Sequence, residues 1–148
     1  MKKIFIVLFT VFFVMPLNSY AMTEKDYPTV KIEIYLHGLT PGITVGSIDI
    51  TIDYNQSRLS YIEATAGSLS AGSTLIANDS KDVVRVGLIH AQGFDGGAKG
   101  SVMTLTFKVI DGHKPSIGDF TIKRILVTDL SGKNLHIDLG KASLSLCS

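Results

Sequence analysis

The chain is 148 residues long and carries 14 Lys and Arg side chains against 13 Asp and Glu, a formal net charge of +1. A charge this close to zero argues against proteins that bind nucleic acid or anionic membrane surfaces through a basic patch. The single cysteine, Cys147, excludes a disulfide within the chain and a thiolate metal cluster.

The first 21 residues have the pattern of a secretory signal peptide. Two lysines precede an apolar run over 4–15, and the small residues Ser19 and Ala21 precede a cleavage site. The run is shorter than the roughly 20 apolar residues of a bilayer span, although an uncleaved anchor is the alternative. We therefore expect a secreted or periplasmic protein, with a polar leader over 22–29, one domain over 30–148 and no membrane segment after cleavage.

Polar and apolar side chains alternate through most of the chain after this leader. Over 44–54, Ile48, Ile50 and Ile52 alternate with polar residues such as Asp49, so a strand would have one apolar and one polar face. A helix would scatter these isoleucines, because residues two apart lie about 200° apart around its axis. The same pattern predicts further strands over 30–36, 59–66, 74–77, 83–91, 101–110, 120–128 and 135–146.

Segments rich in Gly, Pro, Asn and Asp separate these strands and predict turns or loops. Four glycines make 92–100 a predicted loop, and a polar run predicts a turn over 78–82. No sustained helical periodicity follows the signal peptide. Eight or nine short alternating strands predict an all-β fold, an antiparallel two-sheet sandwich in which each sheet has one dry and one wet face.

Residue types that carry chemistry are present but not in catalytic or metal-binding patterns. Asp49 and Asp53 share a strand face, yet four residues along a strand separate them by about 13 Å, beyond the geometry of either class of glycosidase. The spacing of a calcium-binding loop is absent from Asp111, Asp119 and Asp129, which are better explained as turn residues. The histidines fall on separate elements without metal-ligand spacing: His37, His90, His113 and His136. We expect no enzyme, no metal and no cofactor.

β-Sandwich domains that bind sugars commonly display a flat row of exposed aromatic side chains. This chain has no Trp, and its tyrosines are scattered. Tyr35 alone points outward from a predicted strand and does not make a platform. The composition therefore weakens a carbohydrate-binding interpretation without excluding it.

Four segments in this order and spacing resemble a cohesin domain, the receptor module that binds dockerin modules in cellulosomes and related bacterial assemblies. Gly46–Leu59 is similar to the family's strand followed by Tyr-Asp-Pro-x-x-Leu, and Ala66–Leu69 comes soon after it. Val84–Leu88 is the third segment, and Gly100–Val109 is similar to the family's Gly-x-Leu-x-x-Ile/Leu-x-Phe-x-Val strand. The resemblance covers 30–146 and implies a jelly-roll sandwich of about nine strands, close to that of several carbohydrate-binding modules.

The resemblance also implies a binding site. In the family, dockerin docks on one sheet face through an acidic residue on the strand before the tyrosine turn and through apolar and polar residues at the end of a later strand. By motif, Asp49 and its neighbour Ser47 take the first position, while Ile89 and Gln92 fall near the second.

The predicted strand faces point to the same region. Val83, Ile89 and Ala91 face outward, beside a polar row that includes Asp49 and Thr51. Contiguous exposed apolar side chains are typical of a partner surface, and a covering loop or the leader is the alternative. The candidate partner-binding residues are Ser47, Asp49, Thr51, Val83, Ile89 and Gln92.

Together these patterns favour a secreted, non-catalytic cohesin-like module that docks a dockerin-type or other protein partner on one sheet face. One alternative is a carbohydrate-binding module of the same fold that acts in polysaccharide binding or breakdown. Another is a structural cell-surface or adhesin subunit, for which an exposed edge strand would be the sign. We expect no nucleic-acid partner.

Overall fold

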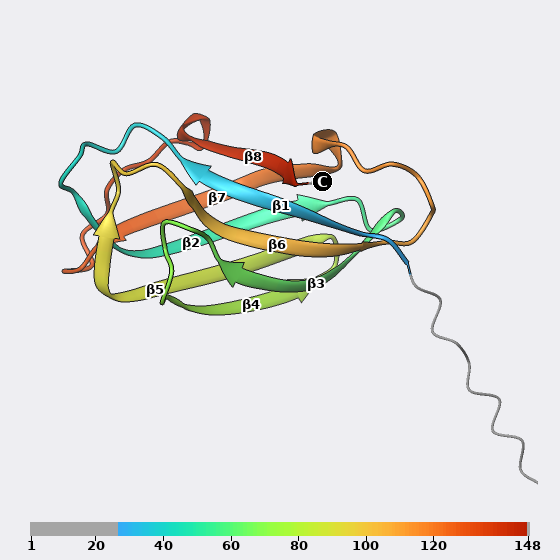
Figure 1. Ribbon diagram of the computed structural model, residues 1–148, viewed down its shortest axis with the longest axis horizontal. Coiled ribbons are helices and arrows are strands. Elements are labelled where there is room, and N and C mark those ends of the chain that lie inside the picture. Colours follow the sequence, from blue (N-terminus) through green and yellow to red (C-terminus); the bar gives the residue numbers. More distant parts are fainter. Residues whose placement is uncertain (1–26, 148) are drawn as a thin grey trace, which may run out of the picture.

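Two antiparallel sheets of four strands each face one another in the computed structural model, which describes residues 27–147 (Figure 1). One sheet has the strand order β3 (Leu59–Ala66), β6 (Ser101–Val109), β1 (Thr29–Leu36) and β8 (Ala142–Cys147). The other has the order β4 (Thr74–Ser80), β5 (Val83–Asp95), β2 (Thr44–Tyr54) and β7 (Phe120–Asp129). Two short 3-10 helices, η1 (Ile117–Asp119) and η2 (Leu139–Lys141), precede β7 and β8. The predicted antiparallel jelly-roll sandwich is confirmed, with eight strands in the described part of the chain instead of about nine.

Within residues 27–147 the chain passes to the other sheet at each connection between strands except the one from β4 to β5. These two strands form a hairpin through Lys81 and Asp82, whose φ angles of 41° and 68° suit a tight two-residue turn. The predicted turn over 78–82 is therefore too long, and β4 runs on to Ser80. Because of the repeated crossing, neighbours within a sheet are mostly distant in sequence.

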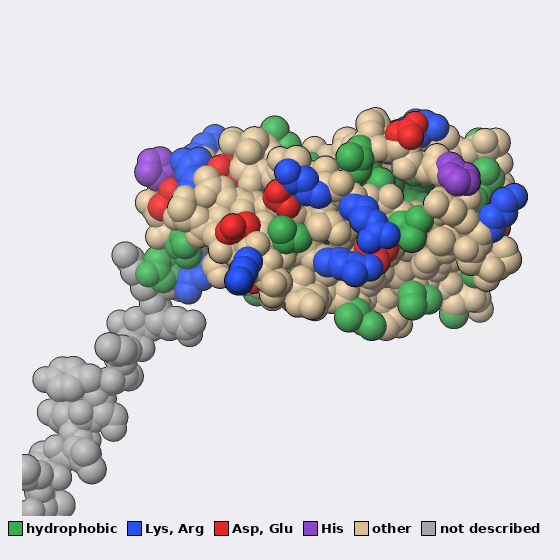
Figure 2. Space-filling model, turned by 180° about the vertical axis from the view of Figure 1, so that it is seen from behind, with side chains coloured by type: hydrophobic (Ala, Val, Ile, Leu, Met, Phe, Trp, Pro, Cys, Tyr) green, Lys and Arg blue, Asp and Glu red, His purple; other side chains and the backbone are tan. Residues whose placement is uncertain are grey.

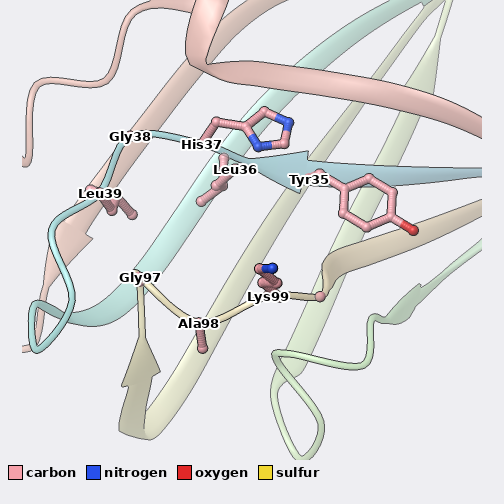
Figure 3. Close-up of a pocket in the computed structure, with 10 residues that line it drawn as sticks. Tyr35, Leu36, His37, Gly38, Leu39, Gly97, Ala98 and Lys99 are labelled. Carbon is pink, nitrogen blue, oxygen red and sulfur yellow. The ribbon is translucent and has the colours of Figure 1, made fainter.

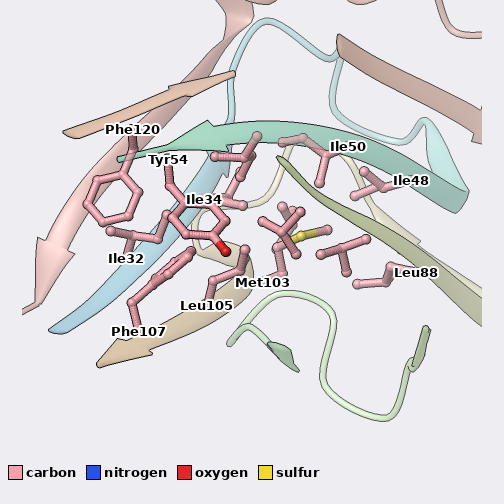
Figure 4. Close-up of a cluster of buried hydrophobic side chains, with 14 of the residues drawn as sticks. Ile32, Ile34, Ile48, Ile50, Tyr54, Leu88, Met103, Leu105, Phe107 and Phe120 are labelled. Atoms are coloured by element: carbon pink, nitrogen blue, oxygen red, sulfur yellow. The ribbon is translucent and has the colours of Figure 1, made fainter. Parts of the chain in front are cut away.

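The alternating apolar side chains form one core between the two sheets (Figure 4). Ile50 and the isoleucines on either side of it on the inner face of β2 are buried, as the alternation predicts. At one end of the core, the ring of Phe107 lies 5.0 Å from the rings of both Tyr54 and Phe120. Burial of each such side chain contributes about 1.5–3 kcal/mol to the stability of the fold. This core fixes the sheets against each other and leaves their outer faces as preformed surfaces.

The strand β5 is longer than predicted. Residues 92–95 belong to it, although the glycines predicted a loop over 92–100. After a register shift, Phe94 pairs with Val45 of β2, and Gly93 adopts a φ of 68°. Glycine here permits a bulge within the strand and does not end it.

The last strand is shorter than predicted. The predicted strand over 135–146 is replaced by β8, which begins at Ala142. Leu135 packs half-buried against the core, and its N–H donates to the carbonyl of Val127 at 2.9 Å. The next residue, His136, has a φ of 48°, a value outside the range of β-strands.

The predicted signal peptide and most of the predicted leader lie outside the described residues. Thr29, the last residue of that leader, is the first of β1. Among residues 27–147, the structure contains no helix with the length and apolar character of a membrane span.

Candidate protein-binding face

The outer face of the β4-β5-β2-β7 sheet carries the predicted binding residues on its two central strands, β5 and β2. Figure 2 views this face, called the outer face below; the outer side of the other sheet is called the opposite face. Residues paired across antiparallel strands point to the same side of a sheet, so the register defines rows across the face. Three consecutive rows are Thr74–Ile89–Ser47–Thr128, Ile76–Gly87–Asp49–Leu126 and Asn78–Arg85–Thr51–Arg124.

Charged side chains of both signs meet in the middle of the outer face, where blue and red atoms adjoin in Figure 2. Arg85 binds Asp49 with two nitrogens: Nε donates to Oδ1 at 3.0 Å, and Nη2 donates to Oδ2. Hydrogen bonding to this carboxylate raises the pKa of Arg85. Nearby, Lys123 Nζ lies 3.0 Å from an oxygen of Asp53. Arg124 is exposed and has no ion-pair partner among residues 27–147, so it leaves one positive charge uncompensated.

Three large aliphatic side chains stand exposed in the same region. Ile76 on β4 is 71% exposed, Ile89 on β5 is 60% exposed, and Leu130, just after β7, is 55% exposed. A shallow hollow of about 260 Å³ lies beside Ile76 and is lined also by Asp49, Asn78, Arg85 and Gly87. A second hollow of about 320 Å³ lies beside Ile89 and Leu130. The outer face thus combines apolar projections, shallow hollows and charged groups.

The family model of the cohesin domain matches residues 25–137, well over half of the chain. The chain belongs to the cohesin domain family. No curated protein matches its sequence.

Solved cohesin structures share the fold of this cohesin domain. The non-cellulosomal cohesin from the hyperthermophilic archaeon Archaeoglobus fulgidus is 20% identical, with a TM-score of 0.56 over 74% of each chain. The type II cohesin A11 from Bacteroides cellulosolvens is 15% identical, with a TM-score of 0.55 over 72% of this chain and 81% of that one. The Coh-OlpA–Doc918 complex from Clostridium thermocellum gives 16% identity and a TM-score of 0.52 over 74% of this chain and 92% of that one.

The cohesin domain brings most of the six predicted binding residues together. Four lie in the adjacent rows on β2 and β5: Ser47, Asp49, Thr51 and Ile89. Val83 is half-buried at the start of β5 beside the hairpin turn, where it pairs with Ser80 and Asp53 in the row after that of Arg85. Gln92 is exposed, but it lies in the irregular stretch of β5 between Ile89 and Phe94 and outside the rows.

Sequence reasoning missed three exposed residues of this cohesin face: Ile76, Arg124 and Leu130. A signal existed for Ile76, because Leu75 and Ile76 are adjacent apolar residues of one short strand and only one of them can face the core. Leu75 is the half-buried one. Arg124 joins the row of Thr51 only through the pairing of β2 with β7, which the sequence does not reveal.

A further pocket, of about 380 Å³, lies at one end of the cohesin sandwich, between the loop after β1 and the glycine-rich segment before β6 (Figure 3). Its histidine, His37, already has a partner, since Nε2 lies 2.6 Å from Ser143 Oγ. Tyr35 at its edge donates its hydroxyl to Glu33 at 2.6 Å, which lowers the pKa of that carboxyl. Of the polar side chains that line the pocket, His37 and Tyr35 are therefore already engaged, and Lys99 is the remaining charged one.

Three features of residues 27–147 bear on the other chemical alternatives. This part of the chain contains no group of three or more His, Cys, Asp or Glu side chains that could hold a metal ion. Asp49 pairs with Arg85, and Asp53 pairs with Lys123. Tyr54 is buried in the core, and Tyr61 is half-buried with its ring against Phe107.

Proposed function

We propose that this cohesin domain is a non-catalytic receptor that binds a dockerin-type protein on its outer face. The observation that carries the proposal is the set of exposed aliphatic side chains, Ile76, Ile89 and Leu130, around the ion pair of Asp49 and Arg85. A cohesin of the same fold from Clostridium thermocellum is in a complex with a dockerin. Family membership and surface chemistry together support a protein partner.

The mechanism is that of a rigid platform. The strands of the outer face are held by the core beneath them, so binding requires little ordering of the backbone. An exposed isoleucine that becomes fully covered by the partner contributes about 1.5–3 kcal/mol to the free energy of binding. The polar residues between the apolar ones, Ser47, Asp49 and Thr51, would set the orientation of the partner. Such a surface needs no cofactor.

We infer from the signal-peptide pattern that the domain acts outside the cytoplasm, in the periplasm or beyond the cell. Amino-terminal sequencing of protein recovered from the periplasm and the medium tests this inference. A mature chain that starts at Met22 would support it. Protein retained in the cytoplasm with residues 1–21 still attached would contradict it.

Isothermal titration calorimetry with a panel of purified type I and type II dockerin modules, loaded with calcium, tests the proposed function. Wild-type protein should bind at least one of them, and Ile89→Asp should weaken that binding by about tenfold or more. The matched control is Ile62→Asp on β3, because Ile62 is also exposed, at 48%, but belongs to the other sheet. The absence of binding to every dockerin, or an equal loss in both variants, would overturn the proposal.

A further inference from the structure

Gly87 occupies the centre of the outer face, in a strand interior where glycine is unfavourable because it is flexible and packs no side chain. Its φ lies outside the left-handed region that requires glycine. A Cβ built on it would meet only the carbonyl oxygen of Ile76, at 3.9 Å, which is ordinary contact. The fold therefore does not require glycine at this position. A glycine inside a strand often marks a place where another molecule approaches closely.

Because Gly87 has no side chain, its position forms part of the hollow of about 260 Å³ on this face. One wall is Ile76, whose side chain is largely exposed, and another is the ion pair of Asp49 and Arg85. The hollow is larger than the cavity of roughly 150 Å³ that accommodates a benzene molecule. Its volume and its apolar wall suit one aliphatic side chain of a partner.

The charged groups on the same face, in and beyond the hollow, indicate which charge the partner carries beside that side chain. Asp49 is neutralised by Arg85, and Asp53 by Lys123. Arg124 lies in the same row as Arg85, on the far side of Thr51, and has no ion-pair partner in the described part of the chain. An exposed guanidinium with unused donors is complementary to a carboxylate, which it can bind with two hydrogen bonds.

We propose that the partner inserts one aliphatic side chain into the hollow above Gly87 and places an Asp or Glu carboxylate against Arg124. This inference rests on the proposed function, because it describes the chemistry of a protein that docks on the same face. It names the recognition elements: an apolar anchor with an acidic neighbour on the partner surface. A partner whose contact surface is basic and lacks such an anchor is not accepted.

The test uses the dockerin module that binds wild-type protein most tightly in the titration described above. Gly87→Ala should weaken binding slightly, and Gly87→Val should weaken it by about tenfold or more, because the larger side chain fills the hollow. Gly140→Val is the matched control, since a Cβ at Gly140 meets open space and the residue lies in η2, outside the residues that line the hollow. Melting temperatures of all variants establish that each is folded.

Charge is tested separately. Arg124→Glu should weaken binding by about tenfold or more. The control is Lys31→Glu, the same change of charge at an exposed residue of β1 on the opposite face, which should alter the affinity less than twofold. Substitution of the partner's acidic contact residue by Lys should restore affinity for the Arg124→Glu variant and weaken it for wild-type protein.

The outcomes separate the two proposals. If no dockerin binds wild-type protein, the proposed function and this inference both fail. If a dockerin binds and Ile89→Asp abolishes binding, but the Gly87 and Arg124 variants bind as wild type does, the inference alone is overturned. Graded loss along the Gly87 series together with rescue by charge exchange supports it.

Discussion

Arg85 reaches diagonally across the sheet to Asp49. In the register, Asp49 pairs with Gly87, and Arg85 pairs with Thr51. The guanidinium nevertheless binds the carboxylate through Nε, 3.0 Å from Oδ1, and through Nη2. Diagonal neighbours in antiparallel strands are within reach of long side chains. The pair fixes two charged groups at the centre of the outer face.

Asp49→Ala should leave the fold intact and weaken partner binding. The ion pair is exposed to solvent, with Arg85 57% and Asp49 26% exposed, and pairs of this kind contribute little to stability. We expect a shift in melting temperature of no more than about 2 °C. Loss of Asp49 releases Arg85 from its fixed orientation, so the dissociation constant for the partner should rise by about tenfold. Calorimetry that gives an unchanged affinity would remove this role from Asp49.

How far the sequence predicts the fold is clearest in the residues around Leu135. The alternation of Leu135 and Ile137 with polar residues coincides with burial, because both side chains are half-buried against the core. It was not sufficient to predict a strand, because backbone pairing depends on a neighbouring strand and His136 has a left-handed φ. Alternation therefore reports burial more directly than it reports pairing.

The same limit applies to the outer face. The alternation in β2 and β5 correctly placed Asp49 and Ile89 on the solvent side. The contact of Asp49 with Arg85, and the presence of Arg124 in the same region, follow from strand order and register. Those are set by packing between segments far apart in the chain, for which a local pattern holds no information.

Arg58 joins the turn after β2 to the loop before β7. Its Nε lies 3.0 Å from Asp111 Oδ2, and its Nη1 lies 2.9 Å from Asp119 Oδ1. Burial alone would raise the pKa of Asp119, but hydrogen bonds from Ser116 and Arg58 outweigh it and hold that pKa below its usual value. The N–H of His113 and the Arg58 guanidinium lower the pKa of Asp111 in the same way.

The stability of the domain should therefore fall in acid. A carboxyl whose pKa is lower in the folded state than in the unfolded state stabilises the fold above its unfolded pKa of about 3.9. This contribution disappears as the pH falls through the lower, folded pKa. Asp119→Asn should lower the melting temperature at pH 7 and flatten its dependence on pH below about 4. Wild-type and variant curves that run parallel between pH 6 and pH 2 would contradict the expected role of Asp119.

Cys147 should react slowly with thiol reagents. Burial raises the pKa of its thiol, and the hydrogen bond and negative charge of Glu33 raise it further. Because the thiolate is the reactive form, a higher pKa leaves less of it at neutral pH. Glu33→Gln should lower the pKa and accelerate the reaction with a chromogenic disulfide at pH 7.5. Full denaturation in urea should abolish the difference between the two proteins, and an unchanged folded-state rate would show that Glu33 does not control the thiol.

The same substitution should destabilise the fold strongly at Gly67 and only slightly, or not at all, at Gly87. A Cβ at Gly67, which follows β3, would overlap the carbonyl oxygen of Ser101, and backbone atoms there cannot move aside cheaply. Gly67→Ala should therefore destabilise the fold by about 2 kcal/mol or more, as overpacking against rigid structure does. Gly87→Ala places its methyl group in ordinary contact with the carbonyl oxygen of Ile76. Alanine is no worse than glycine within a strand, so the free energy of unfolding should change by less than about 1 kcal/mol. Urea unfolding followed by circular dichroism measures both values. Equal destabilisation by the two variants would mean that the fold itself requires glycine at position 87, which would remove the reason to assign that position to a partner.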